Sequence, residues 1–165
     1  YLEQPRGDKM PQGTKDFTIS LWCKPAILAG DFRILVCNQR LDQLQLGVSS
    51  RETLHLLIGG DQSNKLESRR LNWNSNDWYH VGLTRQDSHI MIFRNGESVA
   101  EYTKNVQISV SDSEKRLSFG SRPGIGTQLE RHHPWNGAID DIRIYDIALD
   151  KHQLLKLYRR ELKQR

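Results

Sequence analysis

The chain contains few of the residues that build disulfide scaffolds or membrane spans. Only two of its 165 residues are cysteine, Cys23 and Cys37, and a domain of this length can bury a core without disulfides or metals. No apolar run approaches the roughly 18 residues of a membrane span, and the first ten residues lack the basic-then-apolar order of a secretory signal. We expect one domain, not inserted in a membrane, in which both thiols are buried and free. A disulfide is the alternative, and it requires alpha carbons within roughly 7 Å.

The basic excess is small and is concentrated at one end of the chain. Lysine and arginine number 24 against 20 aspartate and glutamate, for a net charge of +4. Seven basic residues crowd the C-terminal segment: Lys151, His152, Lys156, Arg159, Arg160, Lys163 and Arg165. This distribution argues against a nucleic-acid-binding surface over the whole molecule. The segment could attract a sulfated glycan or another acidic surface, but a docked helix with solvated charges is the favoured interpretation.

Apolar residues recur mostly at every second position, which is typical of half-buried strands. Phe17, Ile19 and Leu21 fall on one face of the first such strand, and Trp22 falls on the other. Further strands are predicted at Phe32–Val36, 44–48, 54–58, 79–84, 90–94, 98–102, 117–120 and 138–145. Short strands at this spacing predict an all-β fold, a two-sheet antiparallel jelly-roll sandwich.

Two local signals fix the turns of this pattern. Asn95 and Gly96 form a pair that accepts the positive backbone angles of a tight hairpin turn. After Asp150, a suitable N-cap, the apolar period becomes helical and predicts a short C-terminal helix. Its apolar positions are Leu154, Leu155, Tyr158 and Leu162.

Three stretches carry a resemblance to a known family. They are DFTISLWCKP at 16–25, WYHVGLTRQDSHIMIFRNGESVAEY at 78–102 and WNGAIDDIRIYDIALDKHQLLKLY at 135–158. In this order they resemble the laminin G-like and pentraxin-like jelly rolls of the concanavalin A-like lectin/glucanase superfamily, and together they span nearly the whole chain. The resemblance implies one domain over residues 1–165 that is a module of a longer protein. It also implies an extracellular or cell-surface location.

Aromatic residues are the first candidates for a binding site, because their faces can stack on the apolar C–H face of a sugar ring. Trp22 projects from the face of its strand opposite the core, although long loops or the terminal helix could also cover that face. Trp73 lies in a polar loop and is the better surface candidate. Trp135 precedes the last strand, and for both Trp73 and Trp135 the alternative is a ring that anchors its loop. Trp78 matches a tryptophan that in the family belongs to the core.

The loop at 121–134 provides the polar candidates. Arg122, His132 and His133 are expected to contribute contacts to a ligand. The two histidines could also bind a metal, but adjacent residues seldom direct both rings to one ion, and a solvated pair is favoured.

Asp140 is the candidate for a structural calcium ion. It falls in line with Ala138, Ile142 and Ile144, so a carboxylate there must be paired or bound to a cation. Domains of the family often hold calcium near the last strand, and the resemblance implies Asp140 as a ligand with Glu3 as its partner. Glu3 lies in a segment predicted to be irregular, and calcium needs six to eight oxygens. The slightly favoured alternative pairs Asp140 with loop amides or an arginine such as Arg143 or Arg85.

No catalytic site is predicted. Glycosidases need two carboxylates across the scissile bond, and the stretches 79–84 and 90–94 contain neither aspartate nor glutamate. We therefore expect a recognition module without enzymatic activity, whose partner is a glycan or glycoprotein, with a structural calcium ion as a candidate. The alternative is a protein-interaction or structural module of a larger secreted or surface protein that binds no glycan. Other domains of the same polypeptide are further candidate partners.

Overall fold

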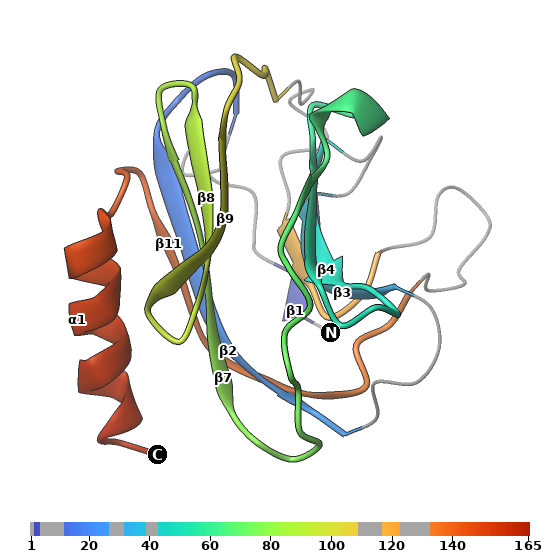
Figure 1. The fold of residues 1–165 in the computed structure, drawn as a ribbon, viewed down its shortest axis with the longest axis vertical. Helices are drawn as coiled ribbons and strands as arrows, with labels where there is room; N and C mark the ends of the chain where they lie inside the picture. The colour runs from blue at the N-terminus through green and yellow to red at the C-terminus, as the bar shows by residue number, and fades with distance from the viewer. Residues whose placement is uncertain (1, 4–11, 27–31, 39–42, 109–116, 123–132) are drawn as a thin grey trace.

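A computed structural model describes residues 2–3, 12–26, 32–38, 43–108, 117–122 and 133–165. Within these residues the chain forms two antiparallel β-sheets that face each other, with one helix on the outside (Figure 1). The predicted all-β sandwich is confirmed. No helix in this part of the protein is long and apolar enough to cross a bilayer.

One sheet has six strands and the other has five. The six-stranded sheet runs in the order β1 (Leu2–Glu3), β10 (Leu117–Phe119), β3 (Arg33–Asn38), β4 (Leu44–Val48), β5 (Leu54–Ile58), β6 (Leu66–Glu67). The five-stranded sheet runs in the order β11 (Gly137–Tyr145), β2 (Phe17–Pro25), β7 (Tyr79–Gln86), β8 (His89–Arg94), β9 (Glu97–Thr103). A short 3-10 helix, η1 (Gln62–Asn64), connects β5 to β6, and α1 (Lys151–Leu162) follows β11.

The core lies between the sheets and collects side chains far apart in the chain. Ile19 and Leu83 from the five-stranded sheet and Leu46 and Leu56 from the six-stranded sheet are each at most 1% exposed. Cys23 and Cys37 are buried free thiols, as expected. Burial of Cys23 raises the pKa of its thiol, so this sulfur is a packing group at neutral pH.

The turn and strand predictions agree closely with the structure, with two exceptions at short strands. Asn95 and Gly96 both have positive φ angles, 53° and 80°, and connect β8 to β9. The two-residue strands β1 and β6 were not predicted. Glu3 therefore lies in a strand, paired with Ser118 of β10, and not in an irregular segment.

Helix α1 covers the outer face of the five-stranded sheet (Figure 1). Leu154 and Leu157 pack against Met91 and Phe93 of β8, which is why this sheet is apolar on both faces. Asp150 caps the helix in a capping box with Gln153, as expected of an N-cap. The expected apolar face is shifted, however: Leu162 is 48% exposed, whereas the third position buried in α1 is Glu161.

Candidate functional site

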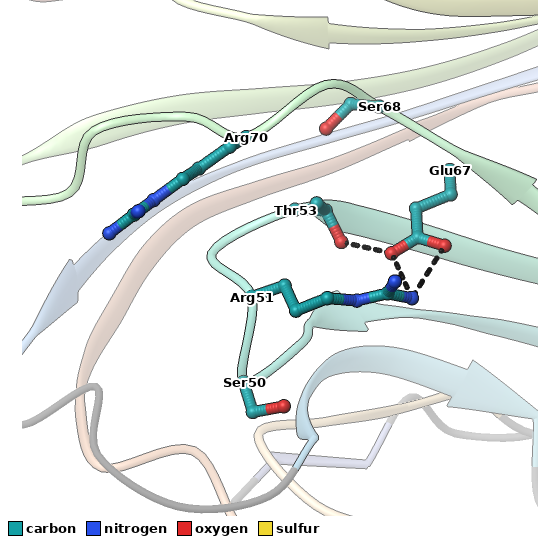
Figure 2. A pocket seen from close by; sticks show the side chains of 6 residues that line it. All are labelled: Ser50, Arg51, Thr53, Glu67, Ser68 and Arg70. Carbon is teal, nitrogen blue, oxygen red and sulfur yellow. Dashed lines mark hydrogen bonds and ion pairs between the residues drawn. The ribbon is translucent and has the colours of Figure 1, made fainter.

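A polar hollow lies beside the ends of β5 and β6 in the six-stranded sheet. It has a volume of about 680 Å³ and is lined by Ser50, Arg51, Thr53, Glu67, Ser68 and Arg70. Figure 2 shows these side chains, which come from the turn that precedes β5, from β6 and from the segment that follows it; Arg51 points toward Glu67, whereas Arg70 points away from it. We call these six residues the polar hollow. Three hydroxyls, two guanidinium groups and one carboxylate make it a site for hydrogen bonding.

The turn that carries Arg51 is held by its neighbour Glu52. Glu52 has a φ of 62°, an unusual angle for a residue other than glycine. Its carbonyl oxygen accepts hydrogen bonds from the Leu71 amide at 3.0 Å and the Trp73 indole at 3.1 Å. Its carboxylate pairs with Arg70 Nε at 3.0 Å, which raises the pKa of that guanidinium. Glu52 thus connects the two segments that line the hollow.

Glu67 is the electrostatic centre of the hollow. Arg51 Nη2 donates to both of its oxygens, at 3.1 and 3.3 Å, and the Thr53 hydroxyl donates to Oε1 at 2.6 Å (Figure 2). Lys65 Nζ lies 2.8 Å from Oε2. Partial burial alone would raise the pKa of Glu67, but the hydrogen bonds from Lys65 and Thr53 and the nearby cationic charges lower it. Glu67 is therefore a carboxylate at neutral pH, and it orients Arg51.

The two guanidinium groups remain accessible to a ligand. The side chains of Arg51 and Arg70 are 72% and 73% exposed even though each pairs with a glutamate. Surface ion pairs of this kind contribute little energy and can be rearranged when a ligand binds. Planar guanidinium groups bind carboxylates and sulfates through paired hydrogen bonds, and they also donate to sugar hydroxyls.

The tryptophans expected to stack on a sugar are buried. Trp22 is 0% exposed and lies beneath α1, against the rings of His80 and Tyr158. Trp73 is 7% and Trp135 is 9% exposed. The expectation that these three rings present a face to a ligand is wrong, because the terminal helix covers the first and the other two belong to the hydrophobic core.

Each of the three indole N–H groups has a protein partner. Trp22 donates to the carboxylate of Glu161 at 2.8 Å, and Trp135 donates to the carbonyl oxygen of Ala138 at 3.2 Å. The Trp73 indole donates to the carbonyl oxygen of Glu52 at 3.1 Å, and the guanidinium of Arg94 lies 4.7 Å from its ring centroid. Trp78, expected in the core, is only partly buried, and Arg165 lies 4.3 Å from its ring centroid.

The polar candidates of the 121–134 loop are only partly described. Arg122 is half-buried and has interactions of its own within the protein. His133 is exposed with a φ of 53°, its carbonyl oxygen accepts from the Ile34 amide at 3.0 Å, and its ring lies 6.1 Å from Phe32. His132 lies outside the described residues. The role of this loop stays a prediction.

Asp140 does not lie in line with the core as expected. A bulge between Asp140 and Arg143 interrupts the pairing of β11 with β2, and Asp141 within it has a φ of 48°. The Asp140 side chain is consequently 61% exposed. Arg165 Nη2 pairs with it at 3.2 Å and with Asp141 at 3.0 Å, so an arginine partner is present, although it is neither Arg143 nor Arg85.

The described residues do not form a calcium site around Asp140. Glu3 belongs to β1 of the six-stranded sheet, whereas Asp140 belongs to β11 of the other sheet. No group of three or more acidic, histidine or cysteine side chains suited to a metal occurs in the described ranges. Calcium binding stays a prediction from the resemblance.

None of the residues that line the polar hollow was a sequence candidate. The available signal was the pairing of two short segments rich in hydroxyl and basic residues, Ser49–Arg51 and Ser68–Arg70, each adjoining a strand. Their proximity depends on β5 pairing with β6, and a two-residue strand gives almost no periodic signal.

Comparison with known proteins agrees with this architecture. A family model described as the Concanavalin A-like lectin/glucanases superfamily matches residues 1–154. No curated protein sequence matches the chain.

Several solved structures are similar to this fold. A candidate carbohydrate binding protein from Bacteroides ovatus has a TM-score of 0.70 at 18% identity; the match covers 89% of this chain but only 42% of that one. The heptameric SAP-like pentraxin from Limulus polyphemus has a TM-score of 0.66 at 19% identity, with coverages of 90% and 73%. The CBM40 module of the Ruminococcus gnavus IT-sialidase, bound to α2,3 sialyllactose, has a TM-score of 0.68 at 17% identity, with coverages of 88% and 84%. At these identities the likeness establishes the fold alone.

Proposed function

This chain belongs to the Concanavalin A-like lectin/glucanases superfamily, and on that premise we propose that it is a non-catalytic module that binds carbohydrate in the polar hollow. The observation that carries the proposal is the pair of exposed guanidinium groups, Arg51 and Arg70, held beside three hydroxyls around one opening. The binding of sialyllactose by the similar CBM40 module supports it.

The chemistry of the hollow fits a hydroxyl-rich, acidic sugar. Arg51 and Arg70 supply exposed N–H donors, and Ser50 supplies an exposed hydroxyl. The hydroxyls of Thr53 and Ser68 are buried and serve instead to hold Glu67 and the backbone in place. Two cationic groups against one carboxylate leave the lining positive, which favours a sugar that carries a carboxylate or sulfate.

The carboxylates near the hollow are poorly suited to glycosidic bond cleavage. A general acid must hold its proton near neutral pH, which requires a raised pKa. The pKa of Glu67 is instead lowered, by hydrogen bonds and cationic charges that outweigh its partial burial. Glu52 is engaged by Arg70 at 3.0 Å. These observations support binding without turnover.

The test is binding to a glycan array that contains neutral, sialylated, uronate and sulfated glycans, followed by titration calorimetry of each hit. We expect saturable binding that Arg51→Ala and Arg70→Ala each weaken by at least about ten-fold, as for the loss of one charge-assisted hydrogen bond. Both side chains are largely exposed, so the melting temperature should change little. Lys15→Ala, at an exposed position outside the hollow, is the matched control.

Two results would contradict the proposal. If no glycan on the array is bound, the alternative of a protein-interaction or structural module of a larger secreted or surface protein is favoured. Release of reducing ends, lost on changing a single carboxylate such as Glu67, would reveal a hydrolase.

A further inference from the structure

Two more hollows lie beside α1. The first, which we call the junction hollow, has a volume of about 400 Å³ and lies where α1 meets the β8–β9 hairpin and residues 69–71; Arg69, Arg94 and Arg159 are among its lining residues. The second, the helix hollow, has a volume of about 330 Å³ and is lined by His152, Leu155, Lys156, Arg159, Arg160 and Lys163.

The three hollows share residues or use consecutive ones. Ser68 and Arg70 line the polar hollow, while Arg69 and Leu71 line the junction hollow. Arg159 lines both the junction hollow and the helix hollow. Residues 68–71 therefore link the polar hollow to the junction hollow along the chain, and Arg159 links the junction hollow to the helix hollow; we call this succession of hollows the path.

This path is strongly basic. Eight lysine and arginine residues line the three hollows, against only two glutamates, Glu67 and Glu97. The excess is local, because the whole chain carries a net charge of only +4. A surface with this imbalance attracts anions through Coulomb forces.

Most of these cations have no acidic partner. The following five of the eight basic side chains form no ion pair with any of the described residues: Arg69, Lys156, Arg159, Arg160 and Lys163. Other basic residues of the same segment are paired, Lys151 with Glu101 at 2.9 Å and Arg165 with Asp140 at 3.2 Å. The unpaired charges are therefore concentrated along the path.

The spacing on α1 suits an extended chain of anionic groups. His152, Lys156, Arg159 and Lys163 follow one another at intervals of three or four residues, so they lie along one face of the helix. At a rise of 1.5 Å per residue, the stretch from His152 to Lys163 covers about 16 Å, roughly three turns. A single small anion would occupy only part of this length.

We propose that the three hollows form one track that binds an extended acidic polysaccharide, a chain of sugars carrying carboxylate or sulfate groups. This inference rests on the proposed glycan binding in the polar hollow, and extends it from one sugar to a polymer that runs from Arg51 to Lys163. Arg69 and Arg159 are the specificity-determining residues of the track, since they lie where one hollow meets the next.

The surroundings of the track favour a polysaccharide over other polyanions. Single-stranded nucleic acid needs exposed aromatic rings for base stacking, whereas the one tyrosine, tryptophan or phenylalanine that lines these hollows, Tyr158, is partly buried and its ring stacks on those of Trp22 and His80. Membrane surfaces need an apolar face to insert, and the large hydrophobic side chains exposed in the described residues are only Ile147 and Leu162. The exposed Ser50 hydroxyl and the exposed guanidinium groups of Arg51 and Arg70 at one end of the track suit the hydroxyls of a sugar.

The test measures binding of the 165-residue chain to two acidic polymers, polygalacturonate and heparin, with neutral dextran as the control polymer. We expect binding to at least one acidic polymer, weakened by salt, with no binding to dextran. Arg69→Gln and Arg159→Gln should each weaken polymer binding roughly three-fold. Lys15→Gln removes the same charge from an exposed position outside the track and should leave the affinity unchanged. Equal melting temperatures establish that the variants are folded.

The outcomes separate this inference from the proposed function. Binding of a mono- or disaccharide that depends on Arg51 supports the glycan site in the polar hollow. If Arg69→Gln and Arg159→Gln nevertheless bind the acidic polymer as tightly as Lys15→Gln, the track is overturned and the glycan site stands. Duplex DNA bound as tightly as heparin, with the same dependence on Arg159, would also overturn the track as a polysaccharide site. If no glycan of any length binds, both proposals fail.

Discussion

His80 is a titratable side chain enclosed between the five-stranded sheet and α1. It is 0% exposed, and its ring lies 5.4 Å from that of Trp22 and 6.0 Å from that of Tyr158. Its Nε2 is 3.7 Å from the carboxylate of Glu161. Burial first, and then the positive charges of Arg143 and Arg165, lower the pKa of His80 to about 4.

This shift predicts a loss of stability in mild acid. His80 in the unfolded chain has its ordinary pKa of 6.5, so as the pH falls below 6.5 the unfolded state binds a proton that the folded state refuses until about pH 4. Stability should decrease across this window, by up to about 3 kcal/mol at its lower end. Urea unfolding curves recorded from pH 7 to pH 4 measure the change.

The matched variant is His80→Gln, which cannot titrate. Carboxylates with lowered pKa values, such as Glu67 and Glu101, also make the folded protein less stable as the pH falls. The informative quantity is therefore the difference in unfolding free energy between the wild type and His80→Gln. We expect the variant to have the shallower pH dependence between 6.5 and 4. Parallel curves would contradict the prediction, because they would mean that His80 has the same pKa in the folded and the unfolded chain.

Single residues show where reasoning from the sequence reached its limit. The alternation of β2 correctly placed Trp22 on the face opposite Ile19, and the terminal helix was one of the named covers. The partner of the Trp22 indole, however, is a buried charge. Glu161 of the helix is 1% exposed, and Arg143 Nε lies 2.6 Å from its Oε1. A glutamate in a basic helix gives no sequence signal for burial, because its partners come from β2 and β11.

At the scale of secondary-structure elements, the β8–β9 hairpin and α1 depend on each other through Gly96. A Cβ atom on Gly96 would lie 2.8 Å from Leu155 Cδ1 and 3.1 Å from the helix backbone at Leu155. The residue also has a φ of 80°, where a side chain is strained. The glycine therefore serves both the turn and the docking of the helix.

Gly96→Ala should destabilise the protein by about 1–2 kcal/mol from the backbone angle alone, with an added cost from displacing α1. Urea unfolding measures the total, and hydrogen exchange of the α1 amides reports the displacement. Ser98→Ala, at an exposed position of the same hairpin, should change neither. If α1 amides exchange as in the wild type, the contact with Leu155 does not anchor the helix.

Most elements were predictable because each carries its own periodic signal. The strands at 44–48 and 54–58 were placed to the residue, and the others within a few residues of their ends. The bulge in β11 was not predictable, since it interrupts the regular pairing with β2 without any change in composition. That single irregularity moved Asp140 from the expected buried face to solvent.

At the scale of the whole molecule, the sheets were easier to predict than the site. Alternation along a strand reports burial, and burial is what a sandwich needs. The polar hollow instead combines a turn and a segment 14 or more residues further on, and the track adds a helix from the other end of the chain. Such a combination depends on tertiary contacts that no local pattern encodes, and residues such as Arg51 and Arg159 were therefore not identified together.

The prediction of a structural calcium ion also belongs to this scale, because an ion bound only by the folded protein stabilises the whole fold. A calcium ion on Asp140 must displace Arg165, which pairs with both Asp140 and Asp141. If calcium binds there, the melting temperature should be higher in millimolar calcium than with a chelator, because saturation at a hundred times Kd adds about 2.7 kcal/mol. Magnesium at equal ionic strength is the control.

Asp140→Asn separates calcium binding at this position from a role in the ion pair. If calcium is bound through Asp140, the variant should lose the response to calcium and melt like the chelated wild type. If the wild type shows no response and the variant is destabilised by less than about 1 kcal/mol, the carboxylate serves only the exposed pair with Arg165. Raising the salt concentration should then weaken the pair between Arg165 and Asp140 while leaving the sheets, and the packing of Leu157 on β8, intact.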